Sequence, residues 1–170
     1  MKLQRILTFL VVLLGGSSTL YAESEHTSGV PLTTDLQADI RQAQARGVPL
    51  LLMFSMDDCH YCMVVHDEFL DPMQRNRDYD DKVLMRIVKM DEGYISDIDG
   101  QRVPVDDLAV RYGASVAPTV VLLDHQGQLL VKRLLGINTP GYYGLYLDRA
   151  IEKSNQRLRE QRAKLDLVQN

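Results

Sequence analysis

Residues 50–62 have the sequence LLLMFSMDDCHYC, in which an apolar run leads to two cysteines that are separated by two residues. The run begins before this stretch and spans residues 48–55. A short continuous apolar run is typical of a strand that is buried on both faces of a sheet. After it, apolar side chains recur at helical spacing from Cys62 to Leu70, so we expect a helix to begin at the cysteine pair, with Cys59 at its N-terminus.

Cys59 and Cys62 are the only two cysteines of the chain. A structural disulfide stabilises a protein mainly by closing a long loop, and a bridge between these two positions closes almost none. Such a short bridge also tends to have strained geometry, which is typical of a disulfide that is meant to be opened. Redox chemistry is therefore the favoured interpretation of the pair, and a metal site and a passive bridge are the alternatives.

Residues 1–22 have the pattern of a secretory signal peptide. A short positive region with Lys2 and Arg5 is followed by an almost wholly apolar run over residues 6–14, and then by small or polar residues that end at Ala22. The apolar run is shorter than the roughly 20 residues that a membrane-spanning helix needs. We expect cleavage after Ala22 and a location in the periplasm, and an uncleaved anchor is the alternative.

The composition is that of an ordinary globular protein, with 170 residues, of which 45% are hydrophobic and 25% are charged. The formal net charge is −4, and removal of the signal peptide, which holds two basic residues and no acidic one, changes it to −6. Nucleic acid is excluded as a partner because binding it requires a basic face. Residues 23–32 are polar and contain Gly and Pro, and we expect them to form a flexible lead-in.

The remaining elements follow from apolar periodicity and from cap and turn residues. In chain order we expect a helix over 35–46 that is capped by Thr33 or Thr34, a strand over 83–88, a polar loop over 91–103, a helix over 104–112, strands over 119–124 and 129–135 that form a hairpin, and a helix over 141–165. This order predicts an α/β fold with a mixed four-stranded sheet that is flanked by helices on both faces. The domain is expected to span residues 33–155, with a charged helical tail over 156–170.

Three features in this order resemble the thioredoxin superfamily. They are a buried strand that ends in Phe54-Ser55, a CxxC motif that opens a helix, and the sequence Val116-Ala117-Pro118-Thr119 directly before a hairpin. The resemblance covers about residues 33–155, and more narrowly the chain resembles periplasmic thioredoxin-like proteins of the SoxW type. It implies a thioredoxin fold and the activity of a thiol:disulfide oxidoreductase, with oxidised substrate proteins as partners and no cofactor.

The helix N-terminus makes Cys59 the expected nucleophile. A free cysteine has a pKa near 8.5, and its reactive form is the thiolate. Unpaired backbone N–H groups and the positive end of the helix dipole stabilise that anion. Cys62 lies one turn further along, where it is shielded, and we expect it to resolve the mixed disulfide that Cys59 forms with a substrate.

The two residues between the cysteines are expected to tune the pair. His60 would stabilise the thiolate of Cys59 if its ring is protonated near the sulfur. Tyr61 resembles the third motif residue of disulfide isomerases, and it would shape access to the sulfurs. A solvated loop histidine and a surface tyrosine without these roles are the alternatives.

The resemblance also implies a cis peptide bond before Pro118, close to the cysteines. A cis bond before proline costs only about 0.5–1 kcal/mol, and an ordinary proline at the start of a strand is the alternative. In the family, the backbone of the residue before this proline pairs with an extended substrate segment. Ala117 is therefore expected to bind substrate by β-addition.

Two positions depart from the thioredoxin pattern. Met53 stands six residues before Cys59, where thioredoxins have a buried acid that assists proton transfer, and Asp58 replaces the usual tryptophan. The sequence therefore does not support proton transfer by the thioredoxin route. Asp57 and Asp58 either raise the pKa of the Cys59 thiol by repulsion or cap the helix, and the capping role is favoured.

Metal binding is the main alternative function, because Cys59, Cys62 and His66 are a three-ligand set for copper or zinc, with His60 nearby. Redox exchange is favoured over it because a cis-proline beside the pair leaves little room for a closed metal site. Residues 90–117 are too few for the helical insertion of DsbA-like oxidases, and we expect no dimerisation domain of the DsbC kind. We therefore expect a monomeric reductant that a membrane thiol transporter of the DsbD or CcdA kind keeps reduced.

Overall fold

The computed structural model describes residues 29–91 and 93–169. The predicted signal peptide and residues 23–28 of the predicted lead-in lie outside the described residues. Within the described part, none of the helices is both long enough and apolar enough to cross a membrane.

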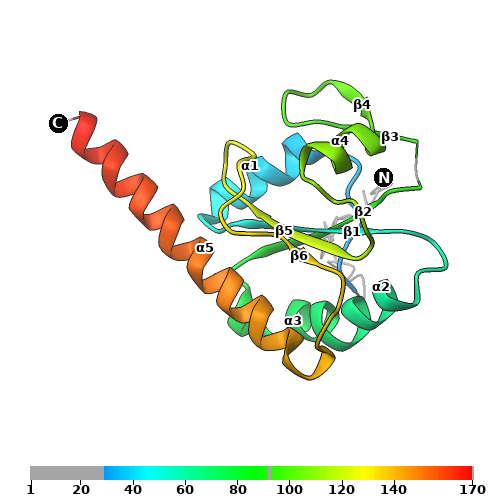
Figure 1. Ribbon diagram of the computed structural model, residues 1–170. Helices are drawn as coiled ribbons and strands as arrows, with labels where there is room; N and C mark the ends of the chain where they lie inside the picture. The colour runs from blue at the N-terminus through cyan, green and yellow to red at the C-terminus, as the bar shows by residue number, and fades with distance from the viewer. Residues whose placement is uncertain (1–28, 92, 170) are drawn as a thin grey trace, which may run out of the picture.

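A mixed four-stranded sheet forms the centre of the molecule (Figure 1). Its strands are β2 (Leu84–Lys89), β1 (Leu50–Ser55), β5 (Thr119–Leu123) and β6 (Leu134–Leu135), in that spatial order. β1 pairs with β2 in parallel and with β5 in antiparallel orientation, and β6 pairs antiparallel with β5. The predicted sheet is therefore confirmed.

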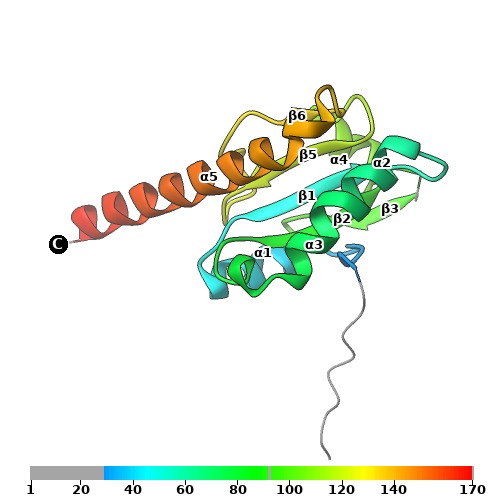
Figure 2. The same ribbon diagram turned by 90° about the horizontal axis from the view of Figure 1, so that it is seen from below.

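Helices cover both faces of the sheet (Figure 1 and Figure 2). α1 (Leu36–Arg46) and α4 (Val105–Arg111) lie on one face, and α5 (Pro140–Gln169) lies on the other beside a helical segment that follows β1. That segment consists, in order, of α2 (His60–Val65), the π-helical turn η1 (His66–Leu70) and α3 (Asp71–Arg75), and the 3-10 turn η2 (Arg77–Tyr79) follows it. The helix predicted to begin at the cysteine pair is thus present, and it contains one π-helical turn.

The central strand β1 is buried along its whole length. Its side chains alternate between two hydrophobic cores: Leu52 and Phe54 face α1 and α4, whereas Leu51 and Met53 face α2, α3 and α5. A strand covered on both faces favours apolar residues at nearly every position, which explains the apolar run in the sequence. The same strand ends next to the cysteine motif, so both cores hold the site in place.

The helix α1 begins at a different cap from the one predicted. Asp35, not Thr33 or Thr34, is the N-cap, and its Oδ1 accepts a hydrogen bond from the Ala38 N–H at 2.9 Å. Asp is a good N-cap residue because its carboxylate also interacts favourably with the helix dipole. Thr33 is buried, and its backbone N–H donates to the Ile87 carbonyl at 2.8 Å, which commits it to the sheet edge.

The segment predicted as a polar loop over 91–103 contains a small hairpin instead. β3 (Tyr94–Ser96) and β4 (Arg102–Pro104) pair antiparallel beside α4. Ile95 is buried in the core that α1 and α4 cover, and Val103 packs against the same core. Ile98, between the two strands, also packs against this core, and the Ser96 N–H donates to the Thr34 carbonyl at 3.0 Å. A few inward apolar side chains in a polar segment are a weak pattern that is easily taken for a loop.

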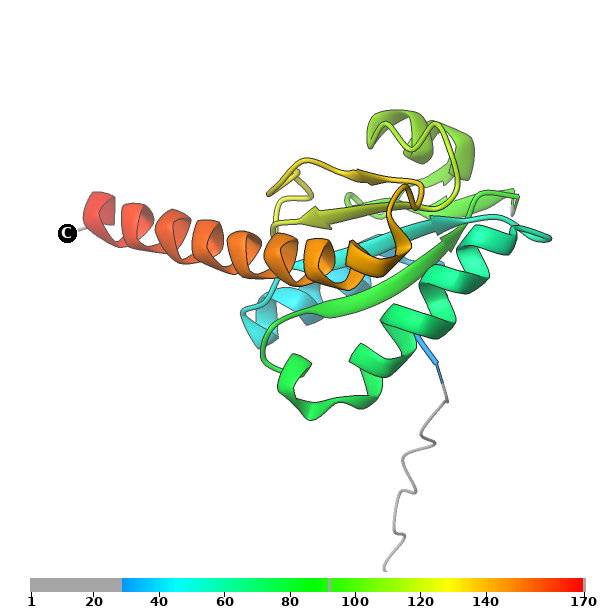
Figure 3. The ribbon, with the colours of Figure 1, turned by 60° about the horizontal axis from the view of Figure 1, so that its bottom comes forward.

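The last strand and the last helix also differ from the prediction. Only Leu134–Leu135 of the predicted strand over 129–135 is regular, and Leu129 contributes a single bridge to Leu123. α5 runs without a break to Gln169, and Figure 3 shows its C-terminal part extending past the edge of the sheet. Leu158 is still buried against the domain, whereas residues 159–168 are exposed.

Residues 30–32, predicted as part of the flexible lead-in, lie along the outer edge of β2. Leu32 forms a parallel bridge to Ile87, and the Ile87 N–H donates to the Pro31 carbonyl at 2.9 Å. Val30 is buried, and its N–H donates to Asp71 at 3.0 Å. Apolar residues beside an unpaired strand edge gain both burial and backbone hydrogen bonds, which the polar composition of the segment concealed.

Burial of Tyr112 is expected to make the domain less stable at alkaline pH. Its hydroxyl is buried and donates to the Gly127 carbonyl at 3.1 Å, and burial raises its pKa to about 12. The folded state therefore favours the neutral phenol, and this contribution is complete below about pH 10 and is lost as the pH rises towards 12. We expect Tyr112→Phe to lower the free energy of unfolding at pH 7 by about 1 kcal/mol and to make its fall above pH 10 less steep.

Urea unfolding between pH 7 and pH 11 tests this expectation. Tyr142→Phe, at an exposed position, is the matched control and should leave the curve unchanged. Tyr79, whose pKa burial and Asp148 raise to about 12, stays in both variants, so part of the alkaline loss should persist. An unchanged alkaline slope in Tyr112→Phe would contradict the assignment.

Candidate active site

The cysteine motif lies directly after the C-terminal end of β1. Cys59 is the N-cap of α2, in extended conformation, and its Sγ accepts a hydrogen bond from the Cys62 N–H at 3.2 Å. Cys59 and Cys62 form a disulfide, with their Cα atoms 5.2 Å apart. The prediction that Cys59 stands at the N-terminus of a helix is confirmed.

The two cysteines differ in their exposure. Cys59 is half-buried, whereas Cys62 is 3% exposed and lies inside the helix. A partner disulfide can reach the sulfur of Cys59 more easily than that of Cys62. The difference matches the roles of nucleophile and resolving cysteine that the sequence predicts.

The loop before Cys59 is held by a charged network. The Asp57 N–H donates to the Asp91 carboxylate at 2.7 Å, and Lys89 at the end of β2 forms an ion pair with the Asp57 carboxylate. The backbone hydrogen bond from Asp57 is the main reason why the pKa of Asp91 is lowered. The predicted capping role of Asp57 or Asp58 is wrong: Asp57 is bound to Lys89, and the cap position belongs to Cys59.

Asp58 adopts a left-handed backbone conformation, with φ of 52°. This region is uncommon for residues other than glycine, and Asp and Asn tolerate it better than most. Its side chain is exposed and forms no hydrogen bond or ion pair with any described residue. An unpaired carboxylate therefore stands immediately before the exposed cysteine.

The segment before β5 lies at the same end of the sheet as the cysteine motif. The register pairs Thr119 with Phe54, so Pro118 is placed beside the end of β1. The peptide bond between Ala117 and Pro118 is cis. Pro118 is buried, and its carbonyl accepts a hydrogen bond from the Gly136 N–H at 2.8 Å. The backbone N–H and carbonyl of Ala117, by contrast, form no hydrogen bond within the described part of the chain.

His60 and Tyr61 are both exposed at the first turn of α2. Their ring centroids are 5.6 Å apart, and Tyr61 is 59% exposed. The structure therefore places both side chains on the surface around the disulfide.

A pocket of about 400 Å³ opens beside the disulfide. Both cysteines line it, and its other walls come from the end of β1, the end of β2, α2 and the N-terminal segment. Its apolar lining residues are Val30, Leu32, Met53, Met56, Met63 and Ile87. The position of the buried acid in thioredoxins is thus occupied by Met53, which is 1% exposed and makes this part of the site apolar.

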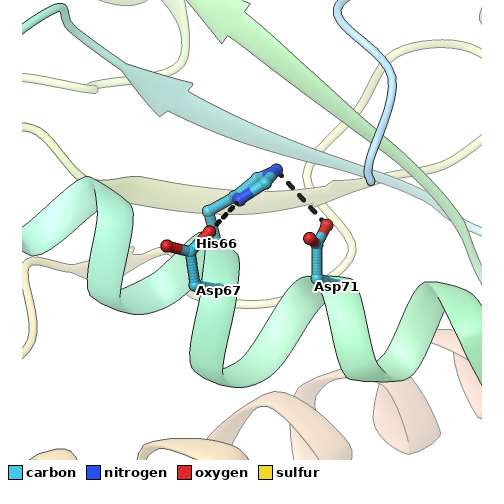
Figure 4. A group of neighbouring side chains, drawn as sticks. All are labelled: His66, Asp67 and Asp71. Carbon is cyan, nitrogen blue, oxygen red and sulfur yellow. Dashed lines mark hydrogen bonds and ion pairs between the residues drawn. The ribbon is translucent and has the colours of Figure 1, made fainter. Parts of the chain in front are cut away.

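His66 lines the same pocket but is held by carboxylates of its own helical segment (Figure 4). Its Nδ1 lies 2.6 Å from Asp67 Oδ1, and its Nε2 lies 3.3 Å from Asp71 Oδ1. In the described residues, these three are the one group of at least three Cys, His, Asp or Glu side chains whose ligand atoms all lie within 4.8 Å of one another. The predicted metal set of Cys59, Cys62 and His66 is therefore not brought together.

Sequence reasoning missed several parts of the site. Met56, Met63 and Lys89 line the pocket, and so does the segment that contains Val30 and Leu32. A signal for Met56 and Met63 was present, because both lie within four residues of a cysteine in the motif region. The positions of Lys89 and of the N-terminal segment depend on the pairing of β2, for which the local sequence carries no signal.

Comparison with known proteins agrees with this arrangement. The family model described as a thioredoxin-like domain matches residues 36–151. The chain belongs to this family. The thioredoxin fold and the placement of a redox-capable CxxC pair in a thioredoxin-like domain are thereby established, and the pair is consistent with an oxidoreductase.

Two solved structures illustrate how the thioredoxin-like domain compares with its relatives. Trxlp from Edwardsiella tarda EIB202 is 24% identical, with a TM-score of 0.50, over 69% of this chain and 97% of that chain. Thioredoxin f from spinach chloroplast, in its short form, is 18% identical, with a TM-score of 0.50, over 75% of this chain and 94% of that chain. At these identities the likeness concerns the fold. A search of curated proteins gave no match.

Proposed function

We propose that this thioredoxin-like protein is a periplasmic thiol:disulfide oxidoreductase, related to the SoxW type, that reduces disulfides of substrate proteins. The observation that carries the proposal is the Cys59–Cys62 disulfide at the start of α2, in which the more exposed sulfur belongs to the N-cap residue. Two cysteines in this position can open and close their bond without a change of fold. The predicted signal peptide supports a location in the periplasm.

The reduced pair transfers two electrons to a substrate disulfide in two steps. The thiolate of Cys59 attacks one substrate sulfur, the substrate S–S bond breaks, and the leaving substrate thiolate takes up a proton. Cys62 then loses its proton and attacks the sulfur of Cys59. The mixed disulfide breaks, the second substrate thiol is released, and the Cys59–Cys62 bond is formed.

Substrate is proposed to bind through the backbone of Ala117. This residue precedes Pro118 at the sheet end that carries the cysteines, and its backbone groups have no partner within the described residues. An extended substrate segment would form hydrogen bonds with both the N–H and the carbonyl of Ala117 by β-addition. The exposed side chains of Val116 and Tyr61 provide further apolar contact area near the disulfide.

The reducing direction is proposed from the architecture. Between β2 and Pro118 the described residues form the β3–β4 hairpin and α4, and the segment is too short for the helical insertion of DsbA-like oxidases. A membrane thiol transporter of the DsbD or CcdA kind would supply the two electrons and two protons for each cycle. Equilibration of the pair with a glutathione redox buffer tests the direction, and a reduction potential above about −150 mV would refute it.

The helix N-terminus is expected to make Cys59 unusually reactive. In the Cys62→Ser variant, where Cys59 is the single thiol, alkylation by iodoacetamide at pH 7 should be at least about tenfold faster than in an unfolded chain. The control is a synthetic peptide of residues 57–62 with the same serine replacement, which has the same local charges but no helix. Equal rates for protein and peptide would remove the basis of the proposal.

A further inference from the structure

The pocket beside the disulfide lies on the opposite side of β1 from Pro118. In the sheet, β1 stands between β2 and β5, and the pocket is bounded by the end of β2, while Pro118 leads into β5. No residue of the segment 116–118 lines it. Ala117 and this pocket therefore lie on opposite sides of the disulfide. A substrate segment that pairs with Ala117 and continues past Cys59 would reach the pocket.

The walls of the pocket are apolar and adaptable. Met53 forms a buried part of the lining, whereas Met56 and Met63 are 45% and 54% exposed at the two sides of the cysteine motif. Leu32, 53% exposed, completes the outer wall because the N-terminal segment is paired to β2. Methionine side chains are flexible and polarisable, so such walls can close around apolar side chains of different shapes.

The rim of the pocket is acidic where it meets Cys59. Asp57 and Asp58 both line it, and the Asp57 carboxylate is paired with Lys89. Asp58, by contrast, has an exposed carboxylate that no other described residue binds. A cationic side chain close to a substrate cysteine would find an unpaired partner there.

We propose that this pocket is a second substrate subsite, which takes an apolar side chain next to the substrate cysteine while Asp58 attracts a basic side chain beside it. The inference rests on the proposed function and specifies its substrate class: proteins whose reactive cysteine has apolar and basic neighbours. Concave shape, apolar lining and a few placed polar groups are the usual properties of a binding pocket. Charge complementarity at Asp58 selects a cationic segment over an acidic one.

Peptide disulfides test the apolar part. The probes are disulfide-linked dimers of short peptides in which the cysteine has either leucine or serine on both sides, so the orientation of the bound peptide does not matter. The reduced protein is expected to reduce the leucine peptide about tenfold faster than the serine peptide. In the double variant Met56→Gln and Met63→Gln, which replaces two exposed thioethers by amides of similar size, the ratio should fall below about threefold.

A second pair of peptides, with lysine or glutamate on both sides of the cysteine, tests the charge. At low salt the lysine peptide is expected to react several-fold faster than the glutamate peptide, because like charges repel at Asp58 and opposite charges attract. Asp58→Asn keeps a residue that tolerates the left-handed backbone and removes the charge, so it should abolish most of this preference. Val110→Gln, on α4 and 80% exposed, is the control and should retain both preferences.

The outcomes separate this inference from the proposed function. If the protein reduces none of the peptides and no small aromatic disulfide reagent, the proposed function fails. If it reduces them all at similar rates, or if the glutamine and asparagine variants keep the wild-type ratios, exchange stands and the subsite is refuted. Because each readout is a ratio of two rates in one variant, a general loss of activity does not affect it.

Discussion

Cys59→Ser is expected to abolish reduction of protein disulfides, with a fall in rate on the order of 10³ or more, because a serine hydroxyl cannot replace the thiolate nucleophile. Cys59 holds the cap position of α2, and its sulfur is the more exposed of the two. Cys62→Ser removes only the resolving step. That variant should complete the first attack and accumulate a mixed disulfide between Cys59 and the substrate.

The two variants are matched controls for each other, because the same chemical change is made three residues apart in one helical turn. Mass spectrometry after incubation with an oxidised substrate distinguishes them. The adduct is expected on Cys62→Ser at Cys59, and no adduct is expected on Cys59→Ser. An adduct on Cys62, or exchange by Cys59→Ser at more than a few per cent of the wild-type rate, would reverse the assigned roles.

Much of the fold could be predicted because its central strand is covered on both faces. The run over residues 48–55 can be recognised without its partners, because a short and almost continuously apolar run is typical of a strand that is buried on both faces. The hairpin of β3 and β4 escaped prediction for the opposite reason. Its apolar anchors are Ile95, Ile98 and Val103, and a few inward apolar side chains among polar residues do not produce a recognisable alternation.

The cysteine pair could be located from sequence because its chemistry is local, whereas its surroundings depend on distant segments. Lys89 reaches Asp57 only because β2 pairs in parallel register with β1. Val30 joins the pocket because Asp71, in α3, binds its N–H. Neither contact has a signature in the residues next to the motif. The first depends on the register of β1 and β2, and the second on the pairing of the N-terminal segment with the outer edge of β2.

The dependence of the site on β1 leads to the second large effect, which concerns stability. Phe54→Ala is expected to lower the free energy of unfolding by about 3–5 kcal/mol. Phe54 is fully buried, one residue before the end of β1, and its ring lies 6.1 Å from that of Tyr112 across the core that α1 and α4 cover. Its removal leaves a cavity that the rigid strand cannot close, and urea unfolding at pH 7 measures the loss.

Phe69→Ala is the matched control, because the same atoms are deleted from a partly buried ring on the other face of the sheet. Phe69 belongs to η1, outside any strand, and its ring centroid lies 5.2 Å from that of Tyr143. Its neighbours can therefore relax more easily. We expect a loss of about half that of Phe54→Ala or less. If the two losses were equal, or if Phe54→Ala cost less than about 1 kcal/mol, β1 would not be the rigid support from which Cys59 is presented.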